Sequence, residues 1–110
     1  MKLIVKSLVV VSALALGTAL HAADAQTNWN KNCKACHGED GKGQTMMGKR
    51  FGCKDYTDAK VQAEMKDEVA FKAIKEGLKK DGKTLMKPFG DKLSDEEIKA
   101  LVDHMRKFKK

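Results

Sequence analysis

The chain has 110 residues, a formal net charge of +7 and 34% charged side chains, so we expect a single small domain. This length excludes a multidomain enzyme with a large catalytic core. The apolar content of 42% and the single proline exclude collagen-like and low-complexity chains.

The sequence begins with the pattern of a secretory signal peptide, predicted over residues 1–25. A basic start is followed by a short apolar run at residues 8–20, and small side chains then surround the predicted cut after Ala22 or Ala25. About 20 apolar residues are needed to span a bilayer, and this run is shorter, so cleavage is favoured over a retained membrane anchor.

The remaining domain, residues 26–110, is expected to be a soluble protein of the periplasm, exported by a Sec-type route. Removal of two lysines and one aspartate with the signal peptide leaves a net charge of +6. A surface of this sign favours acidic proteins or anionic lipid as partners, although scattered lysines also serve solubility alone. Nucleic acid is not an expected partner, since no basic stripe is interleaved with aromatic residues.

The first helix is predicted over residues 27–37, with Thr27 or Asn28 as its cap. Its apolar face is spaced i, i+4, i+7 and comprises Trp29, Cys33 and Cys36. Residues 38–52 contain five glycines and are predicted to form a loop.

Two further helices are predicted in the middle of the chain. Thr57 can cap a short helix that carries Val61 and Met65, and Asp67 can cap a longer one that ends near Gly77. The apolar face of the longer helix is formed by Ala70, Phe71, Ile74 and Leu78.

The last helix follows a loop at residues 81–92. It starts at a capping box that runs from Ser94 to Glu97 and has a basic end, as the helix dipole favours. Its apolar face comprises Ile98, Leu101, Val102 and Met105. No run of residues alternates as a strand does, so an all-α fold of four to five short helices is predicted.

The mature domain is poor in large apolar side chains, and a domain of this size is marginal without a disulfide, metal or cofactor. Three cysteines, Cys33, Cys36 and Cys53, can form at most one disulfide. An embedded cofactor is therefore attractive as an addition to the core.

Residues 33–37 read C-x-x-C-H, the pattern of c-type haem attachment. Thiols three residues apart on a helix can each bond one vinyl group of the same porphyrin, so Cys33 and Cys36 are predicted to hold one haem covalently. The imidazole of His37, directly after the second thiol, is predicted to bind the iron from one side.

Three other uses of these residues were weighed. A redox-active dithiol needs a βαβ setting, which this helical chain lacks. A zinc site could draw on the three cysteines with His37 or His104, but adjacent Cys36 and His37 fit one tetrahedral ion poorly. A disulfide between Cys33 and Cys36 would be strained on a helix.

The sequence resembles the class I c-type cytochromes, the short soluble bacterial proteins with one haem. The resemblance covers essentially all of the mature chain. It rests on Trp29 four residues before the first cysteine, on the C-x-x-C-H motif, on Asp55-Tyr56-Thr57, and on Met86-Lys87-Pro88-Phe89 before a capped terminal helix. It implies a helical fold around haem, with the terminal helices crossing, and electron transfer as the function.

Met86 is the predicted second axial ligand. It lies in a loop whose direction Pro88 helps to fix, and it matches the ligand methionine of the family. Met46 and Met47 follow His37 too closely to cross the haem plane easily. The other candidates are assigned to packing: Met65, Met105 and His104. A thioether ligand opposite histidine leaves the iron saturated, which suits an electron carrier and not an enzyme.

Two residues depart from the expected pattern. Cys53 remains after haem attachment; we expect a small, half-buried residue near Tyr56, or else a reactive thiol able to form a disulfide dimer of an otherwise monomeric protein. His104 replaces an aromatic residue usual in the family and is expected to pack against the first helix.

The predicted function is that of a periplasmic electron carrier, for example of a respiratory chain, that docks weakly on acidic redox partners. A basic ring could surround the haem edge, formed by Lys34, Lys42, Lys49, Arg50, Lys54, Lys83 and Lys87. The alternatives are a haem enzyme or a gas or redox sensor with an open sixth position, and a zinc-binding interaction module.

Overall fold

The computed structural model describes residues 25–110, so the predicted signal peptide lies outside the described residues apart from Ala25. Within the described residues, no helix is long and apolar enough to cross a membrane. In chain order the elements are the π-helix η1 (Trp29–Cys33), α2 (Lys34–His37), α3 (Met46–Phe51), α4 (Ala59–Glu64), α5 (Asp67–Glu76), β1 (Leu78–Lys80), β2 (Lys83–Met86) and α6 (Asp95–Arg106).

The predicted all-α fold class is confirmed, and the first helix runs without a break through residues 25–37. Its middle turn is the π-helix η1, which ends at Cys33. The predicted cap is wrong: the helix has already formed at residue 25, so Thr27 and Asn28 lie inside it. The Asn28 amide instead donates a hydrogen bond of 3.0 Å to the Glu97 carboxylate on α6.

The glycine-rich segment 38–52 is not all loop, since it contains α3. The Thr45 hydroxyl caps this helix by accepting from the Gly48 N–H at 2.8 Å, and Gly52 ends it at a φ of 70°. The prediction failed because five glycines in one segment concealed a capped helix of only six residues.

The prediction that the chain contains no strands is also wrong, because β1 and β2 form a short antiparallel hairpin. Asp81 and Gly82 connect the strands with φ angles of 52° and 76°. An Asp-Gly pair favours a turn in which both central residues have positive φ. Leu78, assigned from the sequence to the apolar face of a helix, begins β1 and is 48% exposed.

The caps of the two middle helices differ by one residue from the predicted ones. Asp58, not Thr57, caps α4 by accepting from the Lys60 N–H at 2.8 Å. Lys66 precedes α5, so Asp67 lies in its first turn, where a carboxylate favours the helix dipole. Gly77 ends α5 as predicted, with a φ of 78°.

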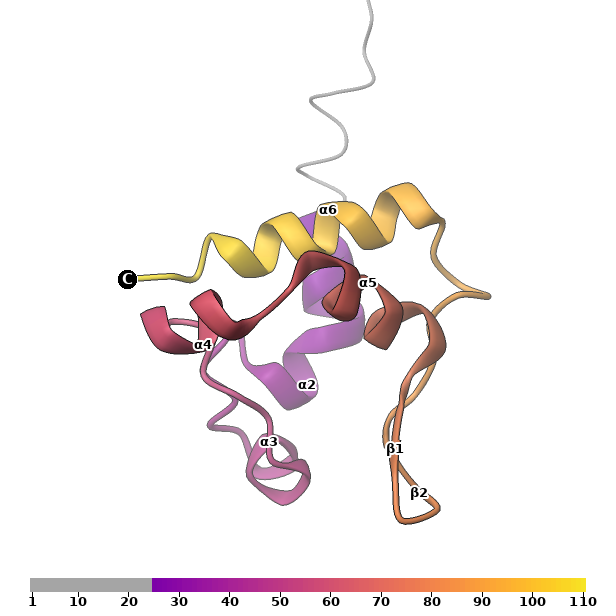
Figure 1. Cartoon of the computed structure of the whole chain (residues 1–110), viewed down its shortest axis with the longest axis horizontal. Helices are drawn as coiled ribbons and strands as arrows, with labels where there is room; N and C mark the ends of the chain where they lie inside the picture. Colours follow the sequence, from indigo (N-terminus) through magenta and orange to yellow (C-terminus); the bar gives the residue numbers. More distant parts are fainter. Residues whose placement is uncertain (1–24) are drawn as a thin grey trace, which may run out of the picture.

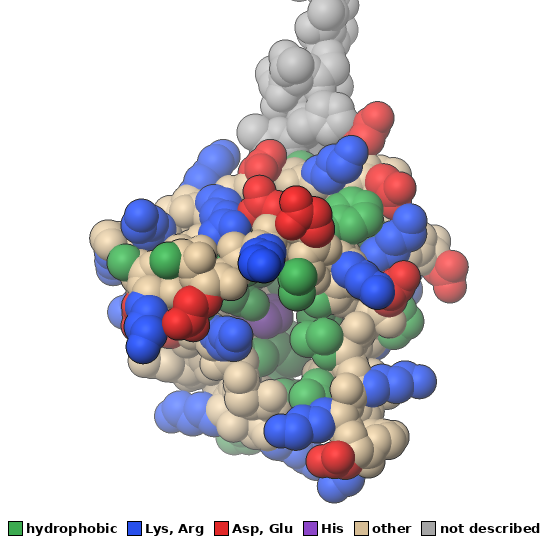
Figure 2. All heavy atoms as spheres, viewed as in Figure 1, with side chains coloured by type: hydrophobic (Ala, Val, Ile, Leu, Met, Phe, Trp, Pro, Cys, Tyr) green, Lys and Arg blue, Asp and Glu red, His purple; other side chains and the backbone are tan. Residues whose placement is uncertain are grey.

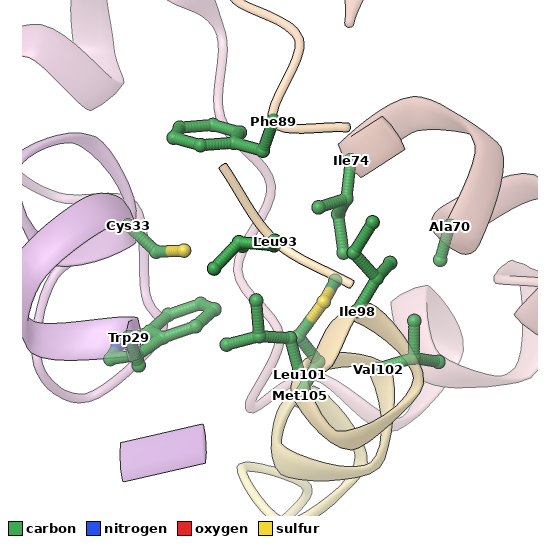
Figure 3. Packing of buried hydrophobic residues seen from close by; sticks show 10 residues of the cluster. All are labelled: Trp29, Cys33, Ala70, Ile74, Phe89, Leu93, Ile98, Leu101, Val102 and Met105. Atoms are coloured by element: carbon green, nitrogen blue, oxygen red, sulfur yellow. The ribbon is translucent and has the colours of Figure 1, made fainter. Parts of the chain in front are cut away.

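The last helix has the predicted capping box. The Ser94 hydroxyl accepts from the Glu97 N–H and the Glu97 carboxylate accepts from the Ser94 N–H, both at 3.1 Å. The four residues predicted for its apolar face are all buried. Figure 3 shows how they pack with residues of the first helix, α5 and the segment before α6; the labelled cluster is Trp29, Cys33, Ala70, Ile74, Phe89, Leu93, Ile98, Leu101, Val102 and Met105.

Helix α6 lies across the first helix and antiparallel to α5 (Figure 1). The ends of α5 and α6 are joined by two ion pairs, Asp67 with Arg106 at 2.7 Å and Lys75 with Asp95 at 3.0 Å. Where the first helix meets the segment after α6, the centroid of the Trp29 ring lies 5.0 Å from that of the Phe108 ring. The terminal helices thus cross, as the resemblance implied, and hold the other elements on one side of α6.

Candidate functional site

The site is a hollow below α5, between the first helix and the hairpin. Figure 2 shows a histidine side chain at its bottom, among hydrophobic side chains. In Figure 1, α2 and α3 lie on one side of this region and the hairpin projects on the other. A hollow of this lining suits a flat apolar group with one polar partner at its base.

The two cysteines of the motif lie on the first helix, and both are free thiols, as is Cys53. Cys33 is buried, and its sulfur points towards Leu93 (Figure 3). Burial, with Cys36 nearby, raises the pKa of Cys33 to about 12. Cys36 is half-buried. The Cys33 side chain is therefore a thiol at neutral pH.

His37 lies between two aromatic rings. Its ring centroid is 5.6 Å from that of Trp29 and 5.6 Å from that of Tyr56. Burial lowers the pKa of His37, which favours the neutral imidazole that binds metals. Its Nδ1 is buried without a hydrogen-bond partner, so ring packing sets the orientation of the imidazole in the described structure.

The segment after the motif folds back over it through backbone contacts. The Trp29 indole N–H donates to the Gly38 carbonyl at 3.0 Å, and the Gly43 N–H donates to the His37 carbonyl at 2.8 Å. The Thr45 hydroxyl donates to the Cys36 carbonyl at 2.7 Å. These bonds fix the ends of the motif and so the direction of its side chains.

Met86 lies at the end of β2, half-buried, and packs against the same hydrophobic cluster that contains Cys33. The Met86 backbone lies very close to Gly77, the residue that ends α5. A Cβ added to Gly77 would lie only 2.6 Å from the Met86 carbonyl oxygen. The Phe89 N–H donates to the Ile74 carbonyl at 2.9 Å, which anchors the chain after Pro88. Met86 thus lies at the base of the hairpin, beside the cluster that contains Cys33.

Two of the other methionines, Met65 and Met105, are placed as the sequence indicated. Met105 is buried and Met65 packs against the core. Met46 is 88% exposed and Met47 is 41% exposed, both on α3.

The two unusual residues also lie as expected. Cys53 is half-buried. Burial, and then electrostatic coupling to Cys53 and Cys33, raises the pKa of Tyr56 to about 12. The His104 ring lies 5.4 Å from Trp29 on the first helix. Burial, and then the nearby Lys107, lowers the pKa of His104.

Sequence reasoning assigned no role at the site to two residues that support it. Tyr56 packs on His37, and its carbonyl accepts a hydrogen bond of 2.7 Å from the side-chain amide of Gln62. Gln62 is buried, and it also donates to the Met105 carbonyl at 2.8 Å. A polar residue between Val61 and Ala63 in a short helix carries no sequence signal for this role.

Of the alternatives that the sequence left open, two are not seen in the described residues. Residues 25–110 bring together no group of three or more His, Cys, Asp or Glu side chains that could hold a metal ion. Cys33 and Cys36 do not form a disulfide. Two free thiols three residues apart, a neutral imidazole and an apolar hollow fit a haem, and together with the crossed helices they define a c-type cytochrome domain.

Comparisons with known proteins agree with this class. Residues 21–105 match the family described as cytochrome c oxidase, cbb3-type, subunit III, and the chain belongs to this family of c-type cytochromes. None of the curated proteins matches it.

Solved structures give the same result. The c-type cytochrome KustC0563 is 40% identical with a TM-score of 0.70, over 79% of this chain and 99% of that one. A tyrosine-to-phenylalanine mutant of Kustc0563 is also 40% identical, with a TM-score of 0.67, over 78% of this chain and 99% of the other.

Proposed function

We propose that the chain is a periplasmic electron carrier with one covalently attached haem. Cys33 and Cys36 would form the two thioethers, and His37 and Met86 would be the axial ligands. The haem supplies an iron that takes up and releases a single electron. The observation that carries the proposal is the packing of the half-buried Met86 against the same hydrophobic cluster that contains Cys33, the first cysteine of the motif.

The protein's own residues would keep this centre rigid. Trp29 and Tyr56 hold the His37 ring from two directions, and the close approach of Gly77 fixes the backbone at Met86. The apolar cluster excludes water from the side of Cys33. Little rearrangement is then needed between the oxidised and reduced forms, which favours fast electron transfer.

Both axial positions are filled by side chains in this proposal, and an enzyme or gas sensor needs one of them open. The family description names a subunit of an oxidase, so a terminal oxidase is one class of acceptor that fits the proposal. Exposed basic residues around the motif and the hairpin would attract acidic partners; among them are Lys34, Lys49, Lys54 and Lys83.

The proposal is tested by visible spectra of the exported protein, oxidised and then reduced with dithionite. We expect sharp low-spin bands on reduction, a weak far-red methionine-to-iron band when oxidised, and no binding of carbon monoxide to the reduced protein. A high-spin spectrum with rapid carbon monoxide binding would instead establish an open site and overturn the carrier.

A further inference from the structure

A shallow groove of about 320 Å³ lies between α5 and the start of β1. Its apolar lining comes from Val69, Ala73 and Leu78. Val69 is 63% exposed and Leu78 is 48% exposed, although both are large apolar side chains. Two exposed apolar side chains at one groove form too small a patch to mark an interaction site alone, so the charges around the groove decide what can dock there.

The hairpin beside this groove is strongly basic. It projects away from the helices (Figure 1), and blue side chains stand around it in Figure 2. Asp81 is the only acid in residues 78–87, against four lysines. None of these lysines makes an ion pair within the part of the chain that is described, and all are exposed; they are Lys79, Lys80, Lys83 and Lys87.

The rim along α5 is different, because it carries both signs of charge. Glu76 pairs with Lys72 at 3.9 Å, and Glu68 lies in the first turn of α5, at the end of the groove remote from the hairpin. A partner therefore meets positive charge at one end of the groove and negative charge at the other. A protein can match this uneven pattern, whereas an anionic lipid surface would also face Glu68.

The groove is joined rigidly to the proposed iron ligand. Gly77 lines the groove and also packs against the backbone of Met86 and Pro88, where an added Cβ would lie 2.6 Å and 2.9 Å from their atoms. The Gly90 N–H donates to the Lys75 carbonyl at 3.0 Å, which holds the chain after Pro88 to the end of α5. A molecule seated in the groove thus lies next to the Met86 segment.

We propose that this groove and the hairpin lysines dock an acidic protein that inserts an apolar side chain between Val69 and Leu78. The inserted side chain supplies the buried contact, and the lysines orient the partner and speed its approach. The proposal rests on the proposed function in one respect: the partner is the protein with which the carrier exchanges electrons, and the groove places it beside the Met86 segment.

The test is an NMR titration of the haem-loaded, ¹⁵N-labelled protein with two synthetic peptides. One peptide has a leucine with glutamates on one side only, and the other has alanine in place of that leucine. We expect shifts centred on residues 68–80, and the leucine peptide should bind about tenfold more tightly, since burial of its side chain adds to the same charge attraction.

Matched variants separate the two contributions. Val69→Ser with Leu78→Ser should abolish the difference between the peptides, and Met46→Ser with Met47→Ser, at the other exposed apolar pair, should preserve it. Charge reversal at Lys79, Lys80 and Lys83 should weaken both peptides about tenfold at low salt, and the same reversal at three exposed lysines elsewhere should have a smaller effect. The control lysines are Lys60, Lys99 and Lys109.

Three results would overturn the proposal. The peptides could bind equally well, the shifts could spread evenly over all basic surfaces, or vesicles of phosphatidylcholine and phosphatidylglycerol in equal parts could displace the leucine peptide from the groove. The visible spectrum of each variant is recorded in parallel. If the unmutated protein lacks the low-spin spectrum expected of the carrier, the proposed function fails. If the spectra are as expected but the peptides cause no NMR shifts at the groove, the docking site alone fails.

Discussion

The replacement Gln62→Leu tests how the fold supports the site. Leucine has a similar volume but cannot donate the bonds of 2.7 Å and 2.8 Å to the Tyr56 and Met105 carbonyls. The Met105 carbonyl keeps a bond from the Phe108 N–H, whereas no other donor to the Tyr56 carbonyl is present in the described residues. An unpaired buried acceptor costs about 1–3 kcal/mol, and a lost hydrogen bond about 1 kcal/mol more, so we expect a loss of about 2–4 kcal/mol.

Thermal unfolding of the haem-loaded protein, followed by circular dichroism, measures this loss. For a domain of this size, Tm should fall by roughly 10–25 °C. Gln44→Leu is the matched control, because Gln44 is exposed, and its Tm should change little. If Gln62→Leu unfolds at the temperature of the control, the buried amide does not hold Tyr56 against His37 as argued.

Three further predictions concern Met86, Gly77 and His104. Met86→Ala should remove the far-red band of the oxidised protein and allow carbon monoxide to bind when reduced, whereas Met46→Ala should keep the spectrum; a band that persists without Met86 assigns the ligand elsewhere. Gly77→Ala should destabilise by about 1–3 kcal/mol more than Gly82→Ala in urea unfolding. Both glycines have positive φ, but only at Gly77 does an added Cβ meet other atoms, so equal losses would contradict the packing argument. Because the pKa of His104 is lowered in the folded protein, the unfolded chain takes up the proton first as pH falls. Stability should therefore decline as pH drops below about 6.5, and His104→Phe should flatten that decline in unfolding measured between neutral and mildly acidic pH. An unchanged pH profile would show that His104 does not titrate differently on folding.

The features predicted well from the sequence are those with strong local signals. The capping box at Ser94 and the 3.6-residue periodicity of α6 fix its start and its buried face. The C-x-x-C-H motif predicts a c-type cytochrome from spacing alone, and the family match agrees with that class. Such signals depend on a few neighbouring residues and do not need the rest of the fold.

The errors arose where a short element is formed by turn chemistry and not by periodicity. The hairpin has too few residues to alternate clearly, and its one sequence signal, Asp81-Gly82, lies within a lysine-rich segment. Helix α3 was concealed by its glycines, of which Gly48 is needed because a Cβ there would meet the Cys36 carbonyl oxygen.

The supporting contacts were beyond the reach of sequence patterns for another reason. Gln62 meets Tyr56 and Met105 only after α4 and α6 have packed, and Arg106 binds the Gln62 and Met65 carbonyls across 44 and 41 residues of sequence. Long-range pairs of this kind leave no spacing in the chain. They become visible only in the folded structure.

The central claim, one haem held by Cys33 and Cys36, is tested most directly by the mass of the purified protein. The protein should be made in a host that matures c-type cytochromes, and its mass recorded after denaturation. We predict the mass of the mature chain plus one haem, and a chain without haem when both cysteines are replaced by serine. A denatured wild-type chain that carries no haem would contradict the account.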